Sequence, residues 1–95
     1  MQHSNSKKAE IIYRLLGETL REEREKQNKS QRVLADEFDI QKSLISRLEN
    51  GVNEPKLVSL WTVCNALDIT IYDLLERVCK KLPEDFVLID NKLVK

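Results

Sequence analysis

The break at Asp39 is the sequence feature that most constrains how this chain folds. In the stretch ADEFDIQKSLIS, residues 35–46, an apolar run with helical spacing stops at Asp39, and a second run starts within three residues. The backbone must reverse direction there, which commonly requires a left-handed residue, and glycine enters that region without strain. Aspartate is one of the few alternatives that tolerate it. The pattern therefore predicts two short helices joined by a tight turn with a left-handed Asp39.

Residues that typically end or cap helices divide the rest of the chain in the same way. Asp68 follows another apolar run, and Thr70 after it can cap the next helix, with Asp73 completing a short-armed capping box. Ser30 is the expected N-cap of the helix that ends at Asp39. Gly17 interrupts the first run without ending it, so we expect close helix packing there. The predicted helices span about residues 7–27, 31–38, 41–50, 56–67 and 71–82.

Length and composition limit the chain to one small domain. Its 95 residues, 41% of them hydrophobic, suffice for a single core. Aromatic residues make up only 5%, and two glycines and two prolines favour helices over a sandwich or barrel. We therefore predict an all-α domain over residues 7–82, with a flexible leader over residues 1–6 and a tail over residues 83–95.

The tail differs from everything before it because it carries a β-prone run. This run consists of Phe86, Val87, Leu88 and Ile89. Residues 92–94 can return as a second short strand after a turn at residues 90–91. Since an isolated hairpin is marginal in water, the tail must either fold onto its own domain or pair with a second copy of the chain. We treat the run as a candidate dimerisation segment.

Composition also argues against several classes of function. The 16 basic and 16 acidic residues cancel, so any electrostatic case for nucleic acid or membrane must be local. Cys64 and Cys79 fall in apolar helical patterns, and we expect two buried thiols in a reducing, cytoplasmic setting. His3, the only histidine, lies in the leader, so no metal site or cofactor is expected. No apolar run approaches the roughly 18 residues that span a membrane.

A resemblance to a known family rests on many positions in order. The stretch SQRVLADEFDIQKSLISRLENGVNEP, residues 30–55, resembles the helix-turn-helix of the lambda-repressor-like, or Cro/XRE-type, regulators. The motif itself would span residues 31–50. Upstream, LGETLREER resembles that family's first helix, and downstream, VSLWTVCNALDITIYDLL resembles its fourth and fifth. The resemblance covers about residues 16–75 and implies a five-helix DNA-binding domain.

The resemblance also implies a role for individual residues. In this motif the second helix enters the major groove while the first crosses the DNA backbone. The residues that it places at base edges are Lys42, Ser43 and Arg47. Those that it places near phosphates are Gln31, Gln41, Asn50, Asn53 and Lys56. The resemblance also pairs Arg24 of the first helix with Glu49, as an ion pair that supports the motif. Any one of these polar residues alone would be ordinary surface, but the order of the whole set favours the motif.

Three classes of function follow, in order of preference. The first is a sequence-specific regulator that binds double-stranded DNA as a homodimer on a palindromic operator, through the tail or the fifth helix. With no sensor domain after the motif, we expect no small-molecule ligand. The second is a helical protein-interaction module with weak or no DNA binding, which the neutral charge keeps open. An enzyme is the weakest, because no nucleophile–base pair, phosphate loop or metal cluster is visible.

Overall fold

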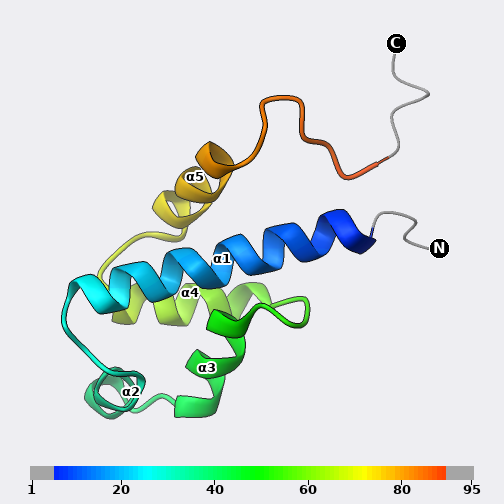
Figure 1. The fold of residues 1–95 in the computed structure, drawn as a ribbon. Coiled ribbons are helices and arrows are strands. Elements are labelled where there is room, and N and C mark those ends of the chain that lie inside the picture. Colours follow the sequence, from blue (N-terminus) through cyan, green and yellow to red (C-terminus); the bar gives the residue numbers. More distant parts are fainter. Residues whose placement is uncertain (1–5, 90–95) are drawn as a thin grey trace.

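Five α-helices form the computed structural model, which describes residues 6–89 (Figure 1). They are α1 (Ser6–Lys26), α2 (Gln31–Phe38), α3 (Lys42–Asn50), α4 (Leu57–Ala66) and α5 (Ile71–Lys81). No strand occurs in this part of the chain, so the predicted all-α fold is confirmed. Each predicted helix agrees with the structure to within one residue at either end. In Figure 1, α2 and α3 lie on one side of α1, and α5 lies on the other.

Left-handed residues follow four of these helices, at Asn28, Asp39, Gly51 and Asp68, and three of the four are not glycine. Asp39 has φ 56° and ψ 46°, and the next N–H, that of Ile40, donates to the Ala35 carbonyl at 2.9 Å. Asp68 has φ 61°, and the N–H of Ile69 donates to the Cys64 carbonyl at 3.0 Å. The predicted left-handed turns are confirmed. A third such turn, at Asn28 with φ 59°, was not foreseen.

Capping bonds fix where two of the helices start. The Ser30 hydroxyl accepts from the N–H of Val33 at 3.0 Å, and the Thr70 hydroxyl accepts from the N–H of Asp73 at 2.8 Å. Both predicted N-caps are confirmed. The expected capping box is only half formed, because the Asp73 carboxylate reaches forward to Arg77 at 2.8 Å instead.

The core draws on every helix. One fully buried residue from each, in chain order, is Leu20, Leu34, Ile45, Val63 and Leu74. Burying a side chain of this size stabilises the fold by about 1.5–3 kcal/mol relative to leaving it exposed. The expectation of two buried thiols is half wrong. Cys64 is buried in this core, which raises the pKa of its thiol to about 11, whereas Cys79 is exposed on α5.

Gly17 allows α1 to pack directly against the end of α3. A Cβ atom at Gly17 would lie 2.5 Å from the Leu48 carbonyl oxygen and would also collide with the carbonyl oxygen of Glu49. Because both obstacles are backbone atoms, a side chain could not turn away from them. The expectation of close packing at Gly17 is confirmed, and this contact sets how α3 lies against the domain.

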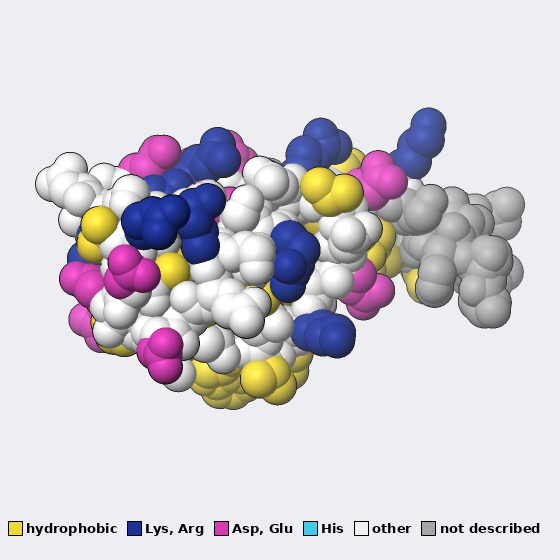
Figure 2. All heavy atoms as spheres, turned by 90° about the horizontal axis from the view of Figure 1, so that it is seen from below, with side chains coloured by type: hydrophobic (Ala, Val, Ile, Leu, Met, Phe, Trp, Pro, Cys, Tyr) yellow, Lys and Arg dark blue, Asp and Glu magenta, His cyan; other side chains and the backbone are white. Residues whose placement is uncertain are grey.

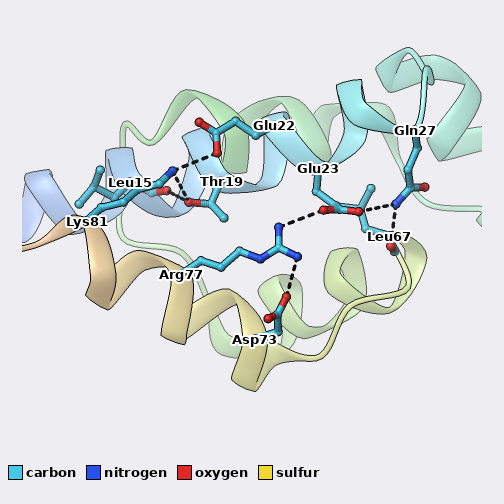
Figure 3. A network of polar contacts seen from close by, with 9 residues as sticks. All are labelled: Leu15, Thr19, Glu22, Glu23, Gln27, Leu67, Asp73, Arg77 and Lys81. Carbon is cyan, nitrogen blue, oxygen red and sulfur yellow. Dashed lines mark hydrogen bonds and ion pairs between the residues drawn. The ribbon is translucent and has the colours of Figure 1, made fainter.

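Polar contacts hold α5 against α1 (Figure 3). Arg77 of α5 donates to Glu23 of α1 at 2.9 Å, and Lys81 donates to the Thr19 hydroxyl at 3.0 Å. Gln27 donates to Glu23 at 3.0 Å and to the Leu67 carbonyl at 2.8 Å. The hydrogen bond from Gln27 and the contact with Arg77 lower the pKa of Glu23 despite its burial. The long α1 helix is therefore bound to α3 on one side and to α5 on the other.

The first half of the tail folds back onto its own domain. Phe86 is half-buried, and its N–H donates to the Pro83 carbonyl at 3.0 Å. Lys8 of α1 donates to the Val87 carbonyl at 2.9 Å. Together with Ile12 of α1, this segment lines a hollow of about 670 Å³. Residues 86–89 are not a strand here, and the predicted return strand lies outside the described residues, as do residues 1–5 of the leader.

Within residues 6–89, no single helix is long and apolar enough to cross a membrane. Only α4 and α5 taken together reach the necessary length and composition, and they are bent by 103° at the break between them. Their apolar residues Leu60, Val63, Leu74 and Val78 belong to the core.

The left-handed turn at Asp39 leads to a testable prediction. Asp39→Gly should leave the free energy of unfolding unchanged or slightly raised, because glycine adopts this conformation without strain. Asp39→Val should lower it by about 1–2 kcal/mol, since a β-branched side chain clashes with the backbone there. Chemical denaturation of both variants checks this, and a valine variant as stable as the glycine variant would refute it.

Candidate nucleic-acid interface

The outer face of α3 presents a row of exposed polar side chains. Apolar residues on its inner face anchor the helix, with Ile45 fully buried and Leu48 nearly so. The exposed residues at and after the start of the helix are Gln41, Lys42, Ser43 and Arg47. Within the part of the chain that the structure describes, none of these four side chains makes a hydrogen bond or ion pair. They are therefore available to a ligand.

Charge pairing shifts the local balance of this region toward the positive. Residues 29–56 contain five basic and five acidic residues. Lys29 and Glu37 pair with each other at 2.7 Å, and Glu49 pairs with arginines of α1. Among the described residues, this leaves four bases without an acidic partner against three such acids. The bases are Arg32, Lys42, Arg47 and Lys56, and the acids are Asp36, Asp39 and Glu54.

Figure 2 shows the face that α2 and α3 form, seen from below the view of Figure 1. Lys and Arg side chains and uncharged groups occupy its middle. Acidic side chains lie on its left part, next to a large basic group, and along its upper and right margins. A polyanion that approaches this face meets bases and hydrogen-bonding groups first, which is the distribution that phosphates require.

A hollow beside the end of α3 gathers several of the predicted phosphate contacts. Asn50, Asn53 and Lys56 line it together with Arg47, which was predicted as a base contact, and its volume is about 440 Å³. The first turn of α4 begins at its edge, where Lys56 is the N-cap and supplies no capping bond from its side chain. Free amides at a helix start, together with the helix dipole, favour an anion. Glu54 and the apolar residues Leu44, Leu48, Val52 and Pro55 also line the hollow, so any attraction for a phosphate rests on its bases and amides.

A buried carboxylate connects this surface to the rest of the domain. Glu49 of α3 accepts from Arg24 of α1 through both oxygens, at 2.7 Å from Nε and 2.9 Å from Nη2. Arg21 lies 3.4 Å from the same carboxylate, and Gln31 of α2 donates to it at 2.9 Å. Arg24 also donates to the Lys29 carbonyl at 2.7 Å. This cluster, which we call the Glu49 cluster, joins α1, α2 and α3.

The hydrogen bonds within the Glu49 cluster keep the Glu49 carboxylate ionised at neutral pH. Burial alone would raise the pKa of Glu49, but hydrogen bonds from Arg24 and Gln31 outweigh that effect, so its pKa lies below the ordinary value of 4.5. The same hydrogen bond raises the pKa of Arg24. Both side chains are charged at neutral pH, and the negative charge of Glu49 is compensated inside the fold.

The sequence-predicted site residues fall into three places. The hollow brings together Arg47, Asn50, Asn53 and Lys56. Gln41, Lys42 and Ser43 lie at the opposite end of α3. Gln31 is part of the Glu49 cluster, and its amide nitrogen keeps a second hydrogen for another acceptor.

Sequence reasoning missed three residues here. Arg21 belongs to the Glu49 cluster, and its position one turn before Arg24 was the available signal. Arg32 is an exposed base without an acidic partner in the described chain, directly after Gln31. Ser59 lines the hollow from α4 and gave no signal in the sequence.

Comparison with known proteins identifies the family. A family model described as helix-turn-helix matches residues 20–74, from the second half of α1 into α5. The chain belongs to the Cro/C1-type helix-turn-helix family. Among solved structures, it is similar to the crystal structure of the clp gene regulator ClgR from C. glutamicum, with 27% identity and a TM-score of 0.67. That likeness covers 78% of this chain and 96% of that chain.

No curated protein sequence matches the chain. Family and fold together are those of DNA-binding transcription regulators and not of an enzyme class. The resemblance drawn from residues 30–55 is therefore confirmed at the level of the family.

Removing the charge of Glu49 should destabilise the protein in a pH-dependent way. Because its folded pKa is lowered, its contribution is fully present above the ordinary value of 4.5 and is lost as the pH falls through the folded pKa. Glu49→Gln should lower the free energy of unfolding by about 3 kcal/mol at pH 7, since Arg24 is left buried without its charge partner. Below pH 4.5 the difference from the wild type should shrink.

Denaturation curves between pH 3 and pH 7 measure this effect. Glu37→Gln is the matched control, because it removes an equal charge from a pair whose carboxylate is 43% exposed. Its cost should stay within about 1 kcal/mol at any pH. Equal losses for the two variants would contradict a structural role for the Glu49 cluster.

Proposed function

We propose that the protein is a sequence-specific transcriptional regulator that binds an inverted repeat in double-stranded DNA as a homodimer, with α3 in the major groove. The observation that carries this proposal is the outer face of α3, where four exposed polar side chains have no partner within the described chain. In the same structure, cations that lie between helices, such as Arg24 of α1 and Arg77 of α5, are bound to acids.

Base recognition falls to the first half of α3. Lys42 and Arg47 suit the acceptor edge of guanine, and Ser43 can either donate or accept. An α-helix fits the major groove, and the N-terminal residues of the second motif helix are the ones that reach base edges. Lys42 and Ser43 occupy the first turn of α3, and Arg47 follows one turn later on the same face.

Phosphate contacts would hold the motif on both sides of α3. On one side lie Gln31 and Gln41, followed by Arg32, an exposed base with no acidic partner among residues 6–89. On the other lies the hollow, with Asn50, Asn53 and Lys56 and the amides at the start of α4. Since the region has an excess of only one unpaired base, we expect weak non-specific binding and a modest dependence of affinity on salt.

A homodimer supplies the specificity that a single motif lacks. One α3 helix reads only a few base pairs, and a two-fold pair of them reads half-sites about 34 Å apart. For the dimer surface we propose exposed apolar residues of α1, α5 and the tail, among them Ile11, Tyr72, Leu75 and Ile89. Because its target is the cell's own DNA, the protein would act in the cytoplasm.

Loss of two base-reading cations should abolish specific binding. Lys42→Ala with Arg47→Ala should weaken binding to an operator selected from random DNA about 100-fold or more, since each good contact contributes roughly 1–3 kcal/mol. The melting temperature should change little, because both side chains are exposed and unpartnered. Fluorescence anisotropy measures the affinity.

The matched control for that variant is Lys7→Ala with Lys26→Ala. It removes the same charge from exposed positions outside the motif and the hollow. Its effect should stay within about threefold. Similar affinity losses in both double variants would show that total charge, and not the face of α3, determines binding.

Deleting residues 86–95 should shift the protein toward monomer in analytical ultracentrifugation. Because Phe86 also packs on its own domain, Ile89→Asp provides a milder test, since that side chain is 64% exposed. Both variants should keep a cooperative thermal transition. An unchanged dimer in both would remove the tail from the interface and leave α1 and α5.

A further inference from the structure

The outer edge of the Glu49 cluster carries a surplus positive charge. Arg24, whose side chain is 9% exposed, donates to both oxygens of Glu49, at 2.7 Å and 2.9 Å, and compensates its charge. Arg21 approaches the same carboxylate only through Nε, at 3.4 Å, and its side chain is 49% exposed. One acid therefore has two arginines, and the surplus charge lies on the exposed one.

The terminal nitrogens of Arg21 are available to a second anion. A guanidinium group carries five N–H hydrogens in a planar fork, and Arg21 directs the one on Nε to Glu49. Neither Nη1 nor Nη2 of Arg21 makes a hydrogen bond within residues 6–89. Because a buried carboxylate already restrains the side chain at Nε, Arg21 loses less conformational freedom when it binds a ligand.

The charge of Glu49 also determines which way the Gln31 amide faces. An ionised carboxylate can only accept hydrogen bonds, so the NH2 group of Gln31 must face it, and not the carbonyl oxygen. Nε2 donates one hydrogen to Oε1 of Glu49 at 2.9 Å, and the second hydrogen has no acceptor among the described residues. The oxygens of a DNA phosphate are likewise acceptors. Gln31 therefore keeps the kind of group that a phosphate requires.

Arg21 and Gln31 converge on a single atom. Both donate to Oε1 of Glu49, Arg21 from α1 and Gln31 from the first residue of α2. Two nitrogens that lie 3.4 Å and 2.9 Å from the same oxygen are close enough for one phosphate group to accept from both side chains.

We propose that Arg21 binds the DNA backbone, and that Glu49 positions it beside Gln31 so that both side chains donate to the same phosphate. The inference rests on the proposed function, in which Gln31 lies near a phosphate, and it adds a contact from α1, outside the motif. Glu49 is a positioning residue in this arrangement, because its side chain is only 1% exposed and touches the two donors instead of the DNA.

The acids near Arg21 on α1 favour a contact over a long-range attraction. Glu18 and Glu25 lie about one turn before and after Arg21, and both are exposed. Neither has a basic partner in the part of the chain that the structure describes. Their charges offset the attraction of Arg21 for DNA at a distance, so we expect its contribution to come from hydrogen bonds made directly to a phosphate.

The test uses the full chain and operators, selected from random DNA, in which an uncharged methylphosphonate replaces the same phosphate in both half-sites, one position at a time. On the unmodified operator, Arg21→Met and Gln31→Ala should each weaken binding about tenfold. At one methylphosphonate position, the same for both variants, the wild type should bind no better than either variant, because the charged acceptor is gone. Fluorescence anisotropy measures each affinity.

Salt dependence separates the two contacts. Arg21→Met should lower the slope of log affinity against log salt concentration by about one per subunit, since one phosphate fewer is neutralised. Gln31→Ala should leave the slope unchanged. Arg21→Gln, which keeps a donor for Glu49, should lower the slope as Arg21→Met does and guards against a loss of folding. The matched control is Lys26→Met, another exposed cation of α1, which should change affinity within about twofold.

Any of three results would overturn the proposal. The first is wild-type affinity in Arg21→Met or in Gln31→Ala. The second is a loss in Arg21→Met that no single methylphosphonate position abolishes, or that Lys26→Met reproduces. The third is that different phosphates account for the losses in the two variants. Failure of the wild type to bind any selected DNA would be a separate result, because it would refute the proposed function itself.

Discussion

The buried carboxylate of Glu49 is the interaction on which the rest of this structure depends. It accepts hydrogen bonds from Arg24 and Arg21 of α1 and from Gln31 of α2, while it belongs to α3. Three helices that would otherwise share only apolar contacts are thereby fixed in one relative orientation. Replacing a buried ion pair with apolar residues is often neutral for stability, so we attribute to the Glu49 cluster a role in orientation more than in net free energy.

Close packing at Gly17 acts together with the Glu49 cluster. The backbone of α1 touches the carbonyl groups of Leu48 and Glu49 at the end of α3, where no side chain fits. The inner side of α3 is therefore held by backbone contact, apolar packing and an ion pair. Its outer side keeps four polar side chains that have no partner among the described residues, and the proposed DNA contact of this neutral domain depends on that division.

Most of the fold could be predicted because its signals are local. Helical periodicity, the caps at Ser30 and Thr70 and the left-handed residues Asp39 and Asp68 act within a few residues of one another. Features that depend on tertiary contact were harder to predict. Whether Cys79 is buried or exposed depends on how α5 lies against α1. The hydrogen bond from Gln31 to Glu49 joins residues of two helices that are 18 positions apart in the chain.

The tail shows the same limit. Its composition favours a strand, but residues 86–88 line a hollow with residues of α1 and α5, and Lys8 of α1 donates a hydrogen bond to the Val87 carbonyl. For the candidate site, the sequence identified the residue types and their order. Only the structure shows that these residues divide between a hollow, a helix face and a buried cluster. The turn at Asp39 needs no tertiary contact, because within the described residues the backbone bond from Ile40 to Ala35 closes it.

Selection of bound sequences from random double-stranded DNA tests the central claim most directly. The account predicts enrichment of an inverted repeat whose half-sites lie about 34 Å, or one helical turn, apart, with fixed bases opposite the start of α3. Recovery of no enriched sequence at physiological salt would contradict it, as would enrichment that survives replacement of both Lys42 and Arg47 by alanine.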